Sequence, residues 1–347
     1  MHSHSCAVSI VVRVSIVAAL GLFLCSTGVA VPSAVIAQDV ETYGGGVSVM
    51  LDPIPSQRRY EDRQDIFQLD PETPLQAVLG FQSYYSEPTP FRIFFLLNYA
   101  QASIGSRSIA APDESEQQPL ASLPQIRDLH QVMELIAPPE EELYFQIWTE
   151  PLATRYYDLS LIVVPDPDKN QRQLPYWTVR QFATRATVYV GDVATPPEID
   201  YPLIDPTPGD DSGSSELLWF GREPHRAGLK AEREVAAGEE VTLTVNYQPY
   251  TDALADDLPE GTPLPVAFVA IIDDRVVPLN GQPVLYGAAV TGRLSWLPAT
   301  VQVPNEPGPH QLFIQQFPNP YVDAREAEET GREFFGTSSQ RFILDAA

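Results

Sequence analysis

The stretch with the clearest metal-binding chemistry is Asp166-Pro-Asp168-Lys-Asn170, in which side-chain oxygens recur at alternate positions. Ca²⁺ is a hard cation that takes about six to eight oxygen ligands, and a loop of this kind can wrap around it. The helix–loop–helix calcium motif is excluded, because its glycine and glutamate positions hold Gln171 and Trp177 here. We expect either a Ca²⁺ site in a β-loop, formed by these three residues, or an ordinary turn stabilised by Asp and Asn side chains.

No pattern in the sequence predicts catalysis. The motifs Gly-x-Ser-x-Gly and His-Glu-x-x-His are absent, and so is a phosphate-binding glycine loop. The histidines beyond the N-terminal region lie in separate segments, at His130, His225 and His310. Acidic runs such as Glu140–Glu142 suit a solvated surface better than an acid–base pair, which needs one carboxyl buried enough to stay protonated. We expect a non-catalytic protein, with an extracellular hydrolase as an alternative.

Aromatic residues gather in segments that we expect to be loops at one end of each half of the chain. They are Tyr84, Tyr85, Tyr176, Trp177, Tyr250, Tyr321, Phe334 and Phe335. Exposed rings suit contacts with carbohydrate or protein, so these residues are the candidate ligand-binding set. The alternative is that the rings fold back and cover the ends of the domains.

The elements that would position these loops occur twice along the chain. The segment Leu159–Pro167 ends in Pro-Asp-Pro, and Leu312–Pro320 ends in Pro-Asn-Pro at an offset of 153 residues. Thr89-Pro90 and the apolar run after it match Thr262-Pro263 at an offset of 173. Because several such matches follow one another in the same order, we interpret the second half as a duplicate of the first.

Alternating apolar residues, as at Leu75, Ala77, Leu79 and Phe81, indicate strands with one face in a core. The run from Phe91 to Leu97 is apolar at nearly every position, which is typical of a strand covered on both faces. Proline is abundant, at 34 residues against 20 Gly, and suits short strands joined by loops. We therefore predict an all-β protein of two tandem immunoglobulin-like antiparallel β-sandwich domains.

One short helix is expected within the first sandwich. Between Leu120 and Ile136, apolar residues recur at intervals of three and four, and Pro138-Pro139 would end the helix. We expect it to cover one end of the sandwich.

The predicted organisation has four parts. They are a signal peptide at residues 1–37, a first sandwich at 40–193, a Pro/Gly/Ser-rich linker at 194–215 and a second sandwich at 216–347. The proposed leader has Arg13, an apolar run from Val14 to Leu24, and a small residue, Ala37, before the expected cleavage point. The alternative is an uncleaved membrane anchor, since the apolar run approaches the ~20 residues that a span needs.

Both cysteines, Cys6 and Cys25, fall within this leader, so the exported chain would contain no disulfide or cysteine nucleophile. The net charge is −25 and lysine occurs only at Lys169 and Lys230, which makes nucleic acid a poor partner. We expect a secreted or cell-surface protein that contacts protein or carbohydrate. Contact with a membrane is expected only if the leader is uncleaved. No cofactor is expected, with Ca²⁺ at the Asp166 loop as the alternative.

Overall fold

The structure of the protein is a computed structural model, which describes residues 46–61, 65–111, 129–169, 182–193, 195–204, 218–220, 232–247, 261–291, 295–330, 337–338 and 341–347. The elements of the first half are β1 (Val47–Pro53), η1 (Pro55–Gln57), β2 (Ile66–Leu69), β3 (Thr73–Ser83), β4 (Thr89–Leu97), β5 (Ala100–Ala102), β6 (Ile104–Ile109), β7 (Met133–Ala137), β8 (Glu142–Leu152), β9 (Tyr156–Pro165) and β10 (Phe182–Val190). Those of the second half are β11 (Leu218–Phe220), β12 (Glu232–Val235), β13 (Glu240–Tyr247), β14 (Pro263–Ile272), β15 (Arg275–Val277), β16 (Leu285–Val290), β17 (Ser295–Gln302), β18 (Gly308–Pro318), α1 (Ala324–Thr330), β19 (Thr337–Ser338) and β20 (Phe342–Ala346).

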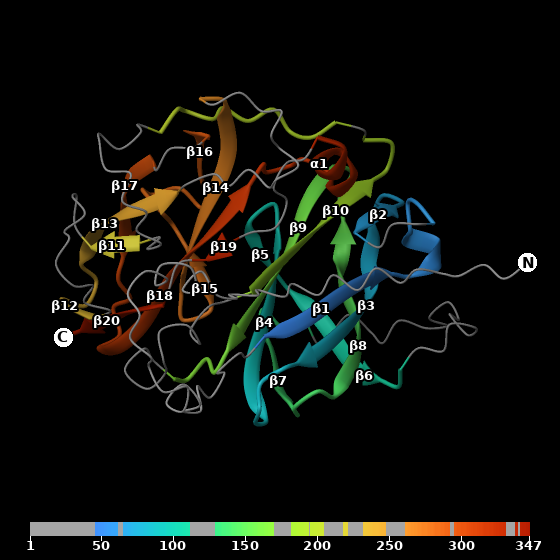
Figure 1. Ribbon diagram of the computed structural model, residues 1–347, viewed down its shortest axis with the longest axis horizontal. Coiled ribbons are helices and arrows are strands. Elements are labelled where there is room, and N and C mark those ends of the chain that lie inside the picture. Colours follow the sequence, from blue (N-terminus) through green and yellow to red (C-terminus); the bar gives the residue numbers. More distant parts are fainter. Residues whose placement is uncertain are drawn as a thin grey trace, which may run out of the picture.

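The two halves share most of their strand order (Figure 1). In the first half, the sheet β1-β3-β8-β6 faces the sheet β2-β10-β9-β4-β5, and β7 also pairs with β4. In the second half, β12-β20-β18-β14-β15 repeats the order of the larger sheet, with β16 in the place of β7 beside β14 and β19 also paired with β18. The smaller sheet, β11-β13-β17, repeats β1-β3-β8, and the described residues of this half contain no counterpart of β6. This division of strands between two sheets is that of immunoglobulin-like sandwiches, so the predicted fold class is confirmed.

The repeat has a different register from the one that the sequence suggested for β4 and β14. Phe91 pairs with Pro165, and Val266 pairs with Pro318, the matching proline of the second half. Phe91 is thus equivalent to Val266, at an offset of 175 residues rather than 173. The sequence match was wrong by two residues because a shift of two leaves every side chain on the same face of a strand.

The predicted helix between Leu120 and Ile136 is wrong over its last residues. Met133–Ala137 forms strand β7, whose five residues pair antiparallel with Thr89–Ile93 of β4. Spacings of three and four over so few apolar residues do not separate a helix from a strand. Residues 112–128 and the predicted leader lie outside the described residues, and no described helix is long and apolar enough to cross a membrane.

The described residues form three apolar cores, one within each sandwich and a third between the two halves. On β4, Ile93 and Phe95 point into the first sandwich, whereas Phe94 and Leu96 point into the third core. The outer faces of β9, β14 and β18 also enter the third core, at Ile162, Val164, Ala267, Val269, Ile271, Phe313 and Phe317. These strands are covered on both faces because the two halves pack face to face. In Figure 1, β4 and β9 lie beside β14 and β18 where the halves meet.

A buried ion pair lies beside the third core. The guanidinium of Arg185, on β10, donates to both carboxylate oxygens of Asp158, on β9, and neither side chain is accessible to solvent by more than 2%. Arg185 also donates to the carbonyl oxygen of Pro318 in the second half, at 2.6 Å. Burial opposes the charged form of Arg185, but the carboxylate of Asp158 outweighs it and raises the pKa of the guanidinium.

Arg341 makes the reciprocal contact from the second half to the first. Its guanidinium donates to the carbonyl oxygens of Pro165 at 2.7 Å and Asp166 at 3.1 Å, while Arg185 donates to those of Pro318 and Asn319. Each half therefore binds the Pro-Asx-Pro turn of the other half.

These turns need Asp or Asn at their centre. Asp166 has a φ of 43° and Asn319 a φ of 45°, a left-handed conformation that Asp and Asn adopt more readily than most other residues. The reciprocal contacts give the interface the geometry of an isologous dimer within one chain.

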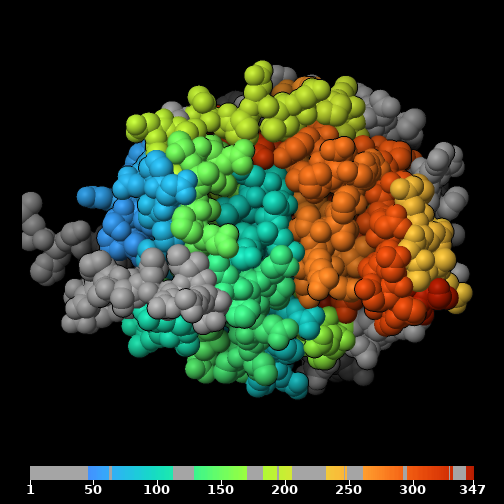
Figure 2. Space-filling model, turned by 180° about the vertical axis from the view of Figure 1, so that it is seen from behind, coloured from blue at the N-terminus to red at the C-terminus, as the bar shows by residue number. Residues whose placement is uncertain are grey.

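Part of the predicted linker is packed against the protein. Ile199 contacts the third core, and Leu203 forms a parallel bridge to Ala288 of β16. Figure 2 shows this segment, in yellow-green, running across the top of both halves. The described portion of the linker, residues 195–204, therefore covers the interface instead of separating the halves.

The ion pair predicts a large effect of one substitution. Arg185→Met leaves the carboxylate of Asp158 buried without its cation, so we expect the free energy of unfolding to fall by about 3–5 kcal/mol in urea titrations. Arg325→Met is the control, because the Arg325–Glu329 pair is exposed and such pairs contribute little. Equal small effects of the two substitutions would contradict the structural role of Arg185.

Candidate interaction site at the interface

A cleft of about 440 Å³ opens where the two halves meet. Its walls come from β4, from β7 and the segment that leads into it, and from β15 and the turn that joins it to β14. The lining residues are Arg92, His130, Gln131, Val132, Glu134, Asp273, Asp274 and Arg275. The volume lies within the range of small ligand sites, of about 300–1,000 Å³, but the lining is charged rather than mainly apolar.

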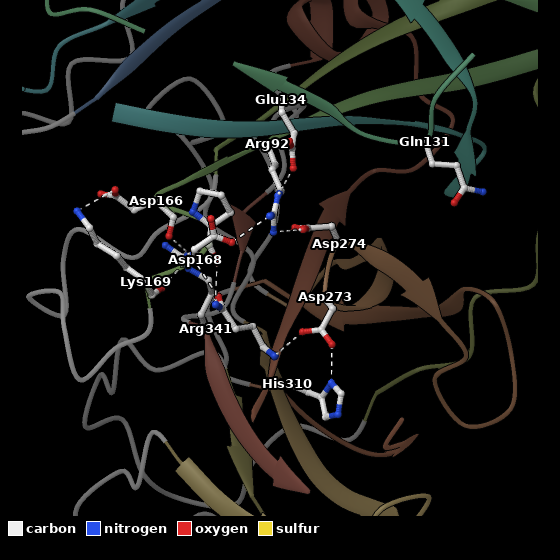
Figure 3. A network of polar contacts seen from close by, with 12 residues as sticks. Arg92, Gln131, Glu134, Asp166, Asp168, Lys169, Asp273, Asp274, His310 and Arg341 are labelled. Atoms are coloured by element: carbon white, nitrogen blue, oxygen red, sulfur yellow. Dashed lines mark hydrogen bonds and ion pairs between the residues drawn. The ribbon is translucent and has the colours of Figure 1, made fainter. Parts of the chain in front are cut away.

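Arg92 is the central cation of the cleft. Its guanidinium donates to Glu134 at 3.0 Å, to Asp168 at 2.9 Å and to Asp274 at 2.8 Å. Figure 3 shows the three carboxylates converging on Arg92 from separate segments. Burial opposes the charge on Arg92, but Asp274 and the other carboxylates outweigh it and raise the pKa of Arg92. Burial also raises the pKa of Asp274, although Arg92 acts in the opposite direction.

A second polar contact lies next to Asp274. Nδ1 of His310 is 2.5 Å from Oδ2 of Asp273, and Nε2 is 2.7 Å from the carbonyl oxygen of Glu306. Burial opposes protonation of the ring, but the hydrogen bonds to Asp273 and Glu306 outweigh it, so the pKa of His310 is raised above its ordinary value of 6.5. The protonated ring can donate to both oxygens at once, which ties β18 to the turn after β14.

In the loop predicted to bind Ca²⁺, both aspartates form ion pairs with basic side chains of the protein. Asp166 lies 3.0 Å from Nζ of Lys169, and Asp168 is bonded to Arg92. Asn170 lies outside the described residues, and within them no group of three or more His, Cys, Asp or Glu side chains is placed to hold a metal ion. The Ca²⁺ site stays a prediction.

The aromatic residues predicted to bind a ligand lie in different environments. Tyr84 is exposed and donates to Oε1 of Gln82 at 2.7 Å. Tyr85 packs edge-on against Phe91, with 5.8 Å between ring centroids, and burial followed by the charge of Asp166 raises its pKa to about 12.

Tyr321 is only 5% exposed and belongs to the third core, where its backbone N–H donates to Asp158. For Tyr321 the structure agrees with the second of the two expectations, a ring that is covered, and the packing of the two halves is what covers it. The remaining predicted residues lie outside the described residues, namely Tyr176, Trp177, Tyr250, Phe334 and Phe335.

Sequence reasoning missed the residues that form the cleft. Arg92 lies in the run that was predicted to be an apolar strand, and the sequence analysis assigned no role to Asp273 or Asp274. Both aspartates have a positive φ, of 47° and 64°, in the two-residue turn that joins β14 to β15. An Asp-Asp pair between two runs of β-branched residues is a recognisable signal for such a turn. The contact of Asp274 with Arg92 could not be predicted, because the two residues lie about 180 positions apart in the sequence.

Comparison with known proteins adds no family. No family model and no curated protein match the chain. Among solved structures, the CARDB domain of the PF1109 protein from Pyrococcus furiosus is 9% identical, with 43% of this chain and 94% of that chain covered and a TM-score of 0.24. The C-terminal domain of the Streptococcus agalactiae polypeptide BspA is 9% identical (87% and 100% covered, TM-score 0.22), and two tandem V-type regions of the chitin-binding protein VCBP3 are 8% identical (86% and 99% covered, TM-score 0.25). Similarity at this level has no bearing on function.

The His310 contact predicts a pH-dependent contribution to stability. Because the pKa of His310 is raised in the folded protein, its contribution is fully present below the ordinary pKa and is lost as the pH rises through the raised value. The difference in unfolding free energy between the wild type and His310→Gln should therefore be larger at about pH 5.5 than at about pH 8.5. Asp273→Asn should show the same trend, and a difference independent of pH for both variants would contradict the ion pair.

Proposed function

We propose that the chain is an exported, non-catalytic interaction module whose two sandwiches act as one rigid body. The observation that carries this proposal is the third core, flanked by the reciprocal contacts of Arg185 and Arg341. A rigid pair of sandwiches holds its edges and loops in a fixed relative position, which lowers the entropic cost of binding a partner across both halves.

The chemistry of the cleft supports a non-catalytic role. Its acidic residues are engaged: Glu134 and Asp274 with Arg92, and Asp273 with His310. A general acid or base must be able to exchange its proton with a substrate, and each of these carboxylates already has one oxygen paired with a basic side chain. The expected leader supports export, and the absence of cysteine beyond it suits a protein stabilised by its apolar cores alone.

The test uses a photo-crosslinking amino acid on the producing cells. Placed at Arg275, an exposed residue that lines the cleft, it should give a reproducible cross-link to one surface partner. Arg107, an exposed arginine on β6, is the matched control and should give none. The proposal is contradicted if neither position cross-links to another molecule, or if the purified protein turns over extracellular polymers.

A further inference from the structure

Equivalent sheet edges of the two halves are covered differently. In the second half, a parallel segment lies on β16: the N–H of Ile204 donates to the carbonyl of Ala288 at 2.8 Å, and the N–H of Ala288 donates to that of Pro202 at 2.9 Å. In the first half, the described residues form no backbone pairing on the outer edge of β7. The side chain of Ile136 there is 69% exposed.

Ile136 and Ala288 occupy the same place in the two sheets. Ile136 lies opposite Pro90, and Ala288 lies opposite Pro265. Proline has no N–H, and the carbonyls of these two prolines accept from Asp166 and Asn319 on their other side, at 2.8 Å each. The N–H and C=O of Ile136 must therefore point away from β4, toward the open edge of the sheet, as those of Ala288 point away from β14.

We propose that the outer edge of β7 binds an extended segment of a partner protein, which adds a parallel strand as residues 202–204 do on β16. The inference rests on the proposed function and specifies its surface and the chemistry of its partner. Main-chain hydrogen bonds to Ile136 supply the pairing, and side chains at neighbouring positions supply the selectivity.

The differences between β7 and β16 define the side chains that fit. On β16, the ring of Tyr201 meets that of Tyr286 at 5.8 Å, and Glu134 stands at the position of Tyr286 in β7. A basic residue is therefore favoured where the covering segment of the second half has Tyr201. In the second half, Leu203 of the covering segment lies opposite Ala288. A partner residue at the position of Leu203 would lie opposite the exposed side chain of Ile136, so an apolar residue is favoured there.

The next position of the partner must be small. Ile204 packs over Gly287, where an added Cβ would lie 2.8 Å from the side chain of Ile204. Leu135 of β7 occupies the position equivalent to Gly287, so a partner residue as large as isoleucine would clash with the side chain of Leu135. The expected partner segment reads basic, any residue, apolar, small.

The charges around the edge agree with a basic partner. Glu134 is exposed at one end of β7 beside Asp273 and Asp274 of the cleft, and the exposed Glu140–Glu142 follow the other end. The opposing cations are Arg92, already bonded to three carboxylates, and Arg275. The net charge of −25 also disfavours a second copy of the chain as the occupant.

The experiment measures binding of a labelled peptide, Gly-Lys-Pro-Leu-Ala-Gly, to the full exported chain by fluorescence anisotropy. We expect binding at micromolar to millimolar concentration and a decrease of about tenfold or more when Lys is replaced by Glu, which corresponds to about 1.4 kcal/mol. Replacement of Ala by Ile in the peptide should also weaken binding. Absence of binding at millimolar concentration, or equal binding of the Lys and Glu peptides, would overturn the proposal.

Two variants of the protein locate the site. Ile136→Pro removes the outward N–H without removing a bond to β4, and should weaken binding by about fivefold or more. Ile136→Val keeps the N–H and should bind as the wild type does. Should Ile136→Pro fail to fold, Glu134→Gln replaces it and should weaken the Lys peptide but not the Glu peptide.

Two other outcomes also overturn the proposal. One is unchanged binding to Ile136→Pro or to Glu134→Gln. The other is dimerisation of the chain that Ile136→Pro abolishes, because a second copy would then be the occupant. Neither result contradicts the proposed function, which the cross-linking experiment tests without this peptide.

Discussion

The structure depends on the burial of two apolar sheet faces against each other. Each of the strands β4, β9, β14 and β18 carries apolar side chains on both faces, and one sandwich core can cover only one of them. Left in water, the outer faces would expose a large apolar surface, which soluble monomers rarely do. Their mutual packing removes this surface and turns two sandwiches into one body, so the polar groups along the interface hold fixed positions.

The polar groups at the interface follow from that packing. Pro-Asx-Pro turns end β9 and β18 with left-handed residues, and their carbonyls lie where an arginine from the other half can reach them. A buried arginine is costly unless its donors are satisfied, and here they are bound by carbonyls, by Asp158 or by Gln311. At the open side of the interface the same geometry brings Arg92 among three carboxylates and leaves a charged cleft beside the β7 edge.

The sequence was informative where the signal is local. Alternation at Leu75–Phe81 and the two Pro-Asx-Pro turns predicted strands, repeats and fold class, and the run Phe91–Leu97 predicted a strand covered on both faces. It could not identify what covers that strand, so it left open whether Tyr321 is exposed or covered. The ion pair of Asp168 with Arg92 could not be predicted, because the two residues lie 76 positions apart. The pairing of β7 with β4 outweighed a helical spacing.

Calorimetric unfolding of the purified protein tests most directly whether the two halves form one body. We expect a single transition in which the calorimetric and van't Hoff enthalpies agree, because unfolding of either half would expose the third core and break the reciprocal arginine contacts. Two separable transitions, each with the enthalpy expected of one sandwich, would contradict it.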